Sequence, residues 1–174
     1  MDRVGQVWIE TVLYTLIGLA LMGLALGFIM PKINEARDKA LVEQAIKSLA
    51  DLDERVSTVI QTGPGNIRQA EFLMKKGELY INPSSDEIIF ILKDLTKPYS
   101  QPGVNISIGR VIVRSEEGQK TSSVYLRLVY SANLTYQGKD EDKKFTAAST
   151  PYKFSIENKG SLNGRIWADI EEIS

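Results

Sequence analysis

The chain has 174 residues, enough for one domain with a hydrophobic core plus a membrane anchor. Its 21 basic and 22 acidic residues give a net charge of −1, so there is no basic excess to neutralise the phosphates of a nucleic acid. It contains no cysteine and no histidine, which excludes disulfides, thiolate metal sites and cysteine nucleophiles and removes the commonest general base and zinc ligand. We therefore expect no enzymatic activity, no cofactor or metal, and no nucleic-acid partner.

A very short polar leader is followed by an uncharged run from Thr11 to Met30. These twenty residues are long enough to cross a hydrocarbon core of about 30 Å at about 1.5 Å per residue. Glu10 stands at the head of the run, where an unpaired carboxylate is costly. Three interpretations compete. The run is a secretory signal peptide cut near Ala25-Leu26-Gly27, a single-span anchor, or a helix whose leader is cut before it. A secretory apolar stretch is normally only about 7–15 residues long.

Arg3, Gly5, Gln6 and Glu10 together form the most specific pattern in the chain. The pattern resembles the processing site of type IV pilins, in particular the archaeal type with a class III signal peptide. In that family a short basic leader ends in glycine, the mature chain begins near a glutamine, and its fifth residue is a glutamate. Cutting between Gly5 and Gln6 makes Glu10 the fifth residue. One departure is that this leader is very short, with a single basic residue beside Asp2.

The resemblance implies a leader at residues 1–5 that a membrane-bound prepilin peptidase removes. Residues 6–30 would then form a helix that spans the membrane and later packs in a filament core. Glu10 would neutralise the free amine of Gln6 in the next subunit, which makes burial of both charges tolerable and fixes the axial register. The partners are further copies of the chain, the membrane before assembly, the peptidase and the assembly machinery. The alternative for Glu10 is that its carboxylate lies solvated among lipid headgroups.

Gly18, Gly23 and Gly27 predict close packing between helices, since small residues four apart, as Gly23 and Gly27 are, let helix backbones approach. Pro31 is expected to bend or interrupt the helix. From residue 31 to residue 62 the pattern is amphipathic, with apolar residues three and four apart. This stripe consists of Ile33, Ala36, Ala40, Ala45, Leu49, Leu52, Val56, Val59 and Ile60. The sequence 62–65, Thr-Gly-Pro-Gly, predicts the end of the helix.

The remainder, residues 66–174, changes to the two-residue period of β-strands. Strands are expected at 67–74, 78–82, 88–93, 104–114, 123–136, 152–157 and 165–171, with a bulge near Gly109 and a charged loop at 137–144. The predicted fold class is α+β. It has a long N-terminal helix, apolar in its first half and amphipathic in its second, packed on a C-terminal antiparallel β-sheet or small β-sandwich.

Two sequons, at Asn105 and Asn133, are candidate N-glycosylation sites, provided that this region lies outside the cell. The positive-inside rule mildly favours the opposite orientation, because Lys32, Arg37 and Lys39 follow the apolar run and only Arg3 precedes it. The pilin resemblance requires the β-rich region outside, and we follow the resemblance.

The sequence thus predicts a structural subunit of an archaeal type IV pilus-like surface filament, and it leaves cell adhesion, motility, uptake and secretion open as its role. It would lie in the cell membrane before assembly and at the cell surface afterwards. Two alternatives remain open. One is a monomeric, membrane-anchored extracellular module for binding or adhesion. The other is a pseudopilin of a secretion or uptake machine, which shares the leader and helix and makes short assemblies.

Overall fold

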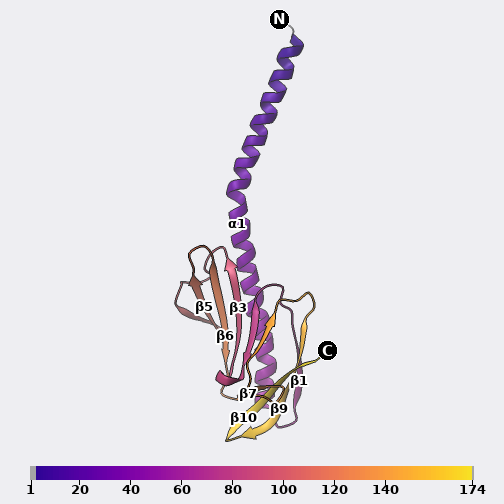
Figure 1. The fold of residues 1–174 in the computed structure, drawn as a ribbon, viewed down its shortest axis with the longest axis vertical. Helices are drawn as coiled ribbons and strands as arrows, with labels where there is room; N and C mark the ends of the chain where they lie inside the picture. The colour runs from indigo at the N-terminus through magenta and orange to yellow at the C-terminus, as the bar shows by residue number, and fades with distance from the viewer. Residues whose placement is uncertain (1–2, 174) are drawn as a thin grey trace. The chain divides into compact units, whose positions relative to one another are not determined.

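The structure is a computed structural model that describes the backbone of residues 3–173 and the side chains of residues 7–161 and 163–173. It begins with one long helix, α1 (Arg3–Gln61), and continues as a β-rich region, residues 67–173, which we call the head (Figure 1). The chain divides into two compact units, Met1–Arg37 and Asp38–Ser174, so the second half of α1 belongs to the same unit as the head.

The head is built from ten strands and one short 3-10 helix, arranged in two sheets. Their bounds are β1 (Ile67–Phe72), β2 (Glu78–Asn82), η1 (Pro83–Ser85), β3 (Glu87–Leu95), β4 (Asn105–Ile108), β5 (Val111–Glu117), β6 (Ser122–Val129), β7 (Asn133–Tyr136), β8 (Lys143–Thr146), β9 (Tyr152–Leu162) and β10 (Arg165–Ile173). The four-stranded sheet has the order β1-β9-β10-β7, and the six-stranded sheet has the order β4-β5-β6-β3-β2-β8. The described strand pairs are antiparallel except β7 with β10.

A hydrophobic core joins the second half of α1 to both sheets. The helix contributes the stripe that its 3.6-residue period places on one face, including Val42, Leu49, Val56 and Val59, each at most 1% exposed. Alternate residues of the strands face this stripe, as the burial of every second position on β6 shows. The predicted α+β class, with a long helix and a predominantly antiparallel β region, is confirmed.

The C-terminal end of α1 is tied to the four-stranded sheet by one buried side chain. Asn158 on β9 is 2% exposed, and its Nδ2 donates hydrogen bonds to the carbonyl oxygens of Val59 at 3.0 Å and Thr62 at 2.6 Å. Its Oδ1 accepts a hydrogen bond from the Gly160 amide at 2.9 Å. The last carbonyls of a helix have no backbone partner within the helix, so Asn158 supplies a donor to Thr62 and adds one at Val59, which also accepts from the Thr62 hydroxyl at 3.1 Å.

The expected single strand from 104 to 114, with a bulge near Gly109, is wrong. The segment forms two strands, β4 and β5, which pair as a tight hairpin with Ile108 opposite Val111. Gly109 has a φ of +60°, so it turns the chain back on itself instead of adding one residue to a continuous strand.

The expected long strand from 123 to 136 is also wrong, because the chain leaves one sheet after Val129 and enters the other at Asn133. Arg165 holds this crossing in place. Its guanidinium donates to the carbonyl oxygens of Ser131 and Ala132, both at 2.9 Å, and to the Asp86 carboxylate at 2.7 Å. The loop expected at 137–144 is shorter than predicted, since β8 already begins at residue 143.

Candidate assembly site

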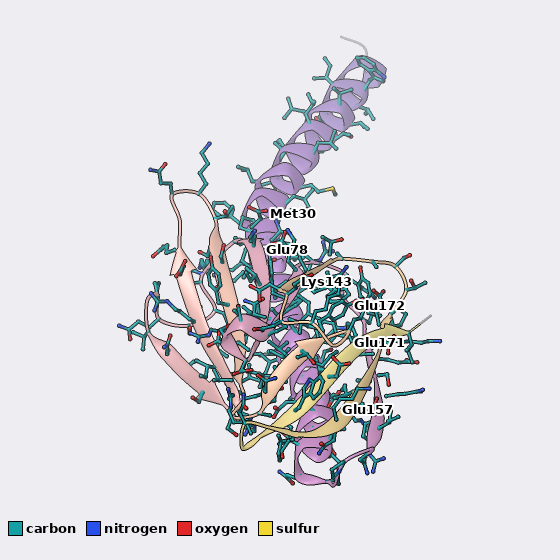
Figure 2. The ribbon with its side chains drawn as sticks, turned by 60° about the horizontal axis from the view of Figure 1, so that its bottom comes forward. Met30, Glu78, Lys143, Glu157, Glu171 and Glu172 are labelled. Atoms are coloured by element: carbon teal, nitrogen blue, oxygen red, sulfur yellow. The ribbon has the colours of Figure 1, made fainter. Side chains whose placement is uncertain are left out.

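The first half of α1 exposes its entire apolar surface. Every residue from Val7 to Ile33 is exposed, with Trp8 at 71%, Leu16 at 61% and Phe28 at 80%. Figure 2 shows side chains projecting from this part of the helix, with Met30 labelled. Burying one such side chain is worth about 1.5–3 kcal/mol, so a helix with this surface is unfavourable in water. The helix is long and apolar enough to cross a membrane, and none of its most apolar stretch is buried within the chain. This surface is compatible with contact with lipid or with another apolar protein surface.

Glu10 lies on this exposed helix and is the only charged residue between Val7 and Met30. Two neighbouring hydroxyl groups are satisfied within the helix. The Thr11 hydroxyl donates to the Val7 carbonyl oxygen at 2.9 Å, and the Thr15 hydroxyl donates to that of Thr11 at 2.8 Å. The carboxylate of Glu10 carries the charge of this surface, and that charge must be neutralised if the helix is buried among other helices.

The three glycines expected to mediate helix packing lie in the exposed segment. A Cβ atom added at Gly18, Gly23 or Gly27 would meet nothing within 4 Å. The space beside each glycine is open, and another helix backbone can approach there.

The predicted cleavage position lies outside the described side chains. Gly5 and Gln6 belong to the first turns of α1, and Met1 and Asp2 lie outside the described residues.

Pro31 does not interrupt the helix. The helix continues through it to Gln61, although proline cannot donate a hydrogen bond to the carbonyl oxygen of Gly27, four residues earlier. A bend at Pro31 stays a prediction. Just beyond the proline, Lys32 and Glu35 form an ion pair at 3.4 Å.

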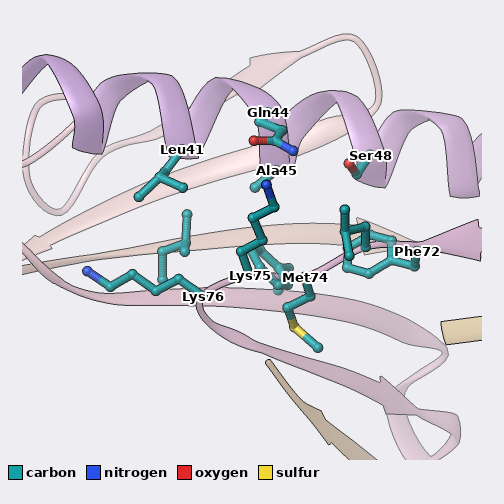
Figure 3. Close-up of a pocket in the computed structure, with 11 residues that line it drawn as sticks. Leu41, Gln44, Ala45, Ser48, Phe72, Met74, Lys75 and Lys76 are labelled. Atoms are coloured by element: carbon teal, nitrogen blue, oxygen red, sulfur yellow. The ribbon is translucent and has the colours of Figure 1, made fainter. Parts of the chain in front are cut away.

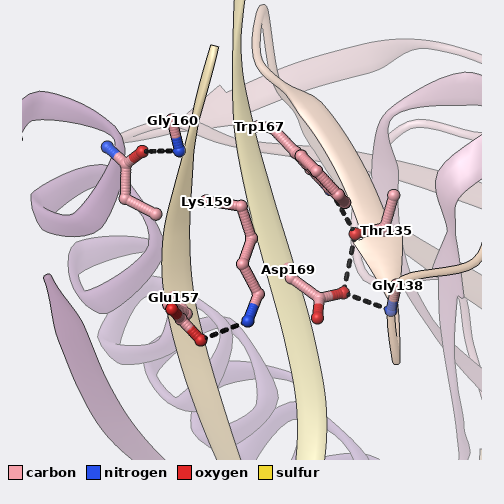
Figure 4. Close-up of polar contacts among 8 residues, drawn as sticks. Thr135, Gly138, Glu157, Lys159, Gly160, Trp167 and Asp169 are labelled. Atoms are coloured by element: carbon pink, nitrogen blue, oxygen red, sulfur yellow. Dashed lines mark hydrogen bonds and ion pairs between the residues drawn. The ribbon is translucent and has the colours of Figure 1, made fainter. Parts of the chain in front are cut away.

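The two sequons differ in accessibility. Asn105 and Ser107 are both exposed on β4. In the second sequon Asn133 is half-buried and Thr135 is only 5% exposed. The Thr135 hydroxyl donates to Asp169 at 2.6 Å and accepts a hydrogen bond from the Trp167 indole nitrogen at 2.7 Å (Figure 4). Asp169 also accepts from the Gly138 amide at 2.8 Å, so this network fixes the sequon in the folded head.

The hollows of the head offer little to a small molecule. A cavity between α1 and the segment 72–76, lined by residues such as Ala45, Phe72 and Met74, measures about 20 Å³, which is room for about one water molecule (Figure 3). Two open hollows of about 210 and 390 Å³ share Ile60 and Ile166 near the end of α1. Arg165 lines the smaller one and is already paired with Asp86. Within the described part of the chain no three acidic side chains gather as metal ligands do.

No protein-family model, curated protein or solved structure matches this chain. The function of the chain is therefore inferred from its own sequence and structure. The architecture is pilin-like, with a long apolar N-terminal helix whose second half packs on a β-sheet. The exposed apolar half of α1 is the candidate site of the chain, and its chemistry is that of association with lipid or with other helices.

Proposed function

We propose that this chain is a structural subunit of an archaeal type IV pilus-like surface filament, cleaved after Gly5 and polymerised through the apolar half of α1. One observation carries the proposal. The segment from Val7 to Met30 exposes all its large apolar side chains, yet it continues directly into a helix that is packed in the head. A bundle of such helices covers each one with others, so that the heads remain in water on the outside.

Glu10 gives this bundle a defined axial stagger. Cleavage after Gly5 leaves a free amine on Gln6, and Gln6 precedes Glu10 by four residues, or about 6 Å along a helix. A neighbouring subunit displaced along the axis by about one turn brings its amine beside the Glu10 carboxylate. In an apolar core each charge alone costs several kcal/mol, and the pair costs far less. Registers that separate the two charges are therefore disfavoured.

The outward face of the six-stranded sheet suits exposure to water. Glu78 is paired with Lys93 at 2.9 Å and with Lys144 at 2.6 Å. Glu87 is paired with Arg127 on the neighbouring strand. Each carboxylate thus lies beside at least one cation, which supports a solvated filament exterior of mixed charge.

The chain would occupy two locations in turn, the cell membrane and then the cell surface. The helix first inserts into the cell membrane, where a prepilin peptidase cuts the leader, and assembly machinery then moves the subunit into the filament at the cell surface. An exterior position of the head makes the exposed Asn105 sequon accessible to glycosylation.

Mass spectrometry of the chain isolated from its native membrane and from sheared surface material tests this proposal. We expect a mature N-terminus at Gln6 and thin filaments in electron micrographs of the sheared fraction. A native chain that retains Met1, or one that begins at Phe28 after signal-peptide cleavage, contradicts the proposed processing.

The second candidate is a monomeric module anchored by a single membrane span, with a head that binds or adheres to a partner. It is favoured by the length of α1, which is sufficient for a span without any polymer. This candidate requires an intact leader and single copies in detergent. A pseudopilin would share the Gln6 terminus and differ in the length of its assemblies, which electron microscopy measures.

A further inference from the structure

The edge strand of the six-stranded sheet, β4, extends beyond the part of the sheet that the hydrophobic core covers. On the side of this sheet that faces the core, residues of β5 and β6 such as Val111, Val113 and Leu126 are at most 1% exposed. The edge strand β4 is exposed along its whole length. The apolar surface of the sheet therefore extends onto β4, where no other part of the described chain buries it.

The register of the hairpin shows on which side these side chains lie. Ile106 pairs directly with Val113, and Ile108 pairs with Val111. Directly paired residues of antiparallel strands point to the same face, so Ile106 and Ile108 share the core-facing side with two buried valines. Their exposures are 36% and 39%, and Val104 just before the strand is 41% exposed. We call Val104, Ile106 and Ile108 the β4 stripe.

The hairpin that carries the β4 stripe is fixed to the second half of α1. Arg110, in the turn of this hairpin, pairs through Nε with the Asp53 carboxylate at 2.9 Å, and Asp53 is 7% exposed on the helix. The guanidinium also donates to the Val129 carbonyl oxygen at 3.3 Å and lies 5.7 Å from the centre of the Tyr130 ring. These contacts hold the hairpin in place, so its apolar side is preformed for a partner.

The small size of the stripe limits which partner fits. An independent protein–protein interface needs about 800 Å² per partner, far more than three partly exposed aliphatic side chains provide. The stripe is adequate only as one part of an interface whose remainder lies elsewhere. The same chain carries a long apolar helix whose most apolar stretch is not buried within the chain. Each copy therefore exposes two apolar surfaces, the first half of α1 and the β4 stripe.

We infer that the β4 stripe of one subunit packs against the apolar segment 7–30 of α1 from a second copy. This inference rests on the proposed filament and identifies a surface of the head that takes part in it. The two faces match in chemistry, because segment 11–30 is uncharged and the side chains of the stripe are aliphatic. The backbone N–H and C=O groups in the middle of a helix are already hydrogen-bonded to each other, so the helix needs no polar partner on this surface.

Cysteine cross-linking in the assembled polymer tests the inference, and the chain contains no cysteine of its own. Two differently tagged full-length chains are expressed together. One carries Ile106→Cys, and the other carries a single cysteine scanned through residues 12–26. Ser107→Cys is the matched control, because it neighbours Ile106 on the same exposed strand and points to the opposite face. Thermal unfolding of each cysteine variant checks that the head is intact.

We expect disulfides between the two tags for Ile106→Cys, with a yield that rises and falls every three to four helix positions, because a helix presents one side to the sheet. The Ser107→Cys control should give at least about tenfold less product. Filaments that form without an Ile106 cross-link, equal yields from the two strand positions, or a disulfide only between two Ile106→Cys chains overturn this inference and leave the filament intact. Chains that never associate overturn the inference and the proposed function together.

Discussion

The side-chain amide of Asn158 on β9 donates a hydrogen bond to the carbonyl oxygen of Thr62, 2.6 Å away, just beyond the end of α1. The two residues are 96 positions apart in the chain. Any force on the helix is therefore transmitted to the four-stranded sheet through a buried polar contact as well as through the apolar core. This contact matters most if the helix is a filament component, since the head is then held to the polymer through α1.

Replacing Asn158 with alanine should destabilise the head by about 2–3 kcal/mol. The substitution leaves the Val59 and Thr62 carbonyl oxygens without this buried donor and the Gly160 amide without its acceptor. Denaturant unfolding followed by Trp167 fluorescence, in a Trp8→Phe background, measures the change. Asn105→Ala, at an exposed asparagine on β4, is the control and should alter stability by less than about 0.5 kcal/mol. Equal effects of the two substitutions would contradict the structural role of Asn158.

The Glu78 cluster should make stability fall in acid. Hydrogen bonds from Lys144 and then Lys93 lower the pKa of Glu78 from 4.5 to about 2. A carboxyl whose pKa is lower in the folded state stabilises the fold above its unfolded pKa, and the stabilisation is lost as the pH falls toward the folded pKa. The melting temperature of the native chain should thus exceed that of Glu78→Gln above pH 4.5, and the difference should shrink between pH 4.5 and 2.

High salt should weaken the same difference, because the Lys93 and Lys144 side chains are exposed to solvent and salt screens their charges. Glu71→Gln, at an exposed carboxylate on β1, supplies the reference for removing one negative charge. A melting-temperature difference for Glu78→Gln that is independent of pH over this range would refute the role of the cluster.

Pro31→Ala should stabilise the middle of α1. Alanine supplies the amide donor that proline lacks, so the Gly27 carbonyl oxygen gains a helical partner, and alanine is favoured over proline in a helix interior by about 3 kcal/mol. Hydrogen exchange of the detergent-solubilised chain should show slower exchange for the amides around residues 28–35. Unchanged exchange there, with the head equally protected in both proteins, would show that Pro31 is not a weak point of the helix.

Glu10→Ala should prevent assembly without preventing membrane insertion. Removing one partner of a buried charge pair costs about 3–5 kcal/mol, which corresponds to a loss of filament of about a hundredfold or more. Quantification of the chain in the sheared fraction and in the membrane fraction separates assembly from insertion. Glu54→Ala, at an exposed glutamate on α1 within the head unit, is the control. Normal filament yield from Glu10→Ala would remove the argument for a charge-paired register.

The elements that follow from local pattern were predicted well, and those that depend on distant partners were not. From Ala45 to Val59 the predicted stripe matches the buried helix face, whereas its first three members, Ile33, Ala36 and Ala40, are exposed. Alternation located β2 at its observed bounds. The change in parity near Gly109 is equally compatible with a bulge and with a tight turn, and only the pairing of β4 with β5 distinguishes them. The exit of the chain from the sheet after Val129 depends on Arg165, much later in the chain, so no local signal marks it.

The candidate site was visible in the sequence because it depends on composition. A run of apolar residues with a glutamate at its head can be recognised without any structure, and the structure adds that the most apolar stretch is not buried within the chain. The sequence pattern indicates neither the β4 stripe nor the hydrogen bonds from Asn158 to the end of α1. Ile106 alternates like any core residue, and its exposure follows from the width of the sheet relative to the helix, which is a tertiary property.

The buried hydroxyl of Thr135 determines whether glycosylation at Asn133 can follow folding of the head. It donates to Asp169 and accepts from Trp167, and both of these residues lie on β10, which follows Thr135 in the chain. An enzyme that needs this threonine to recognise Asn133 can therefore act only before β10 has paired with β7. A sugar at Asn133 would show that transfer preceded folding, whereas a sugar at Asn105 is compatible with either order.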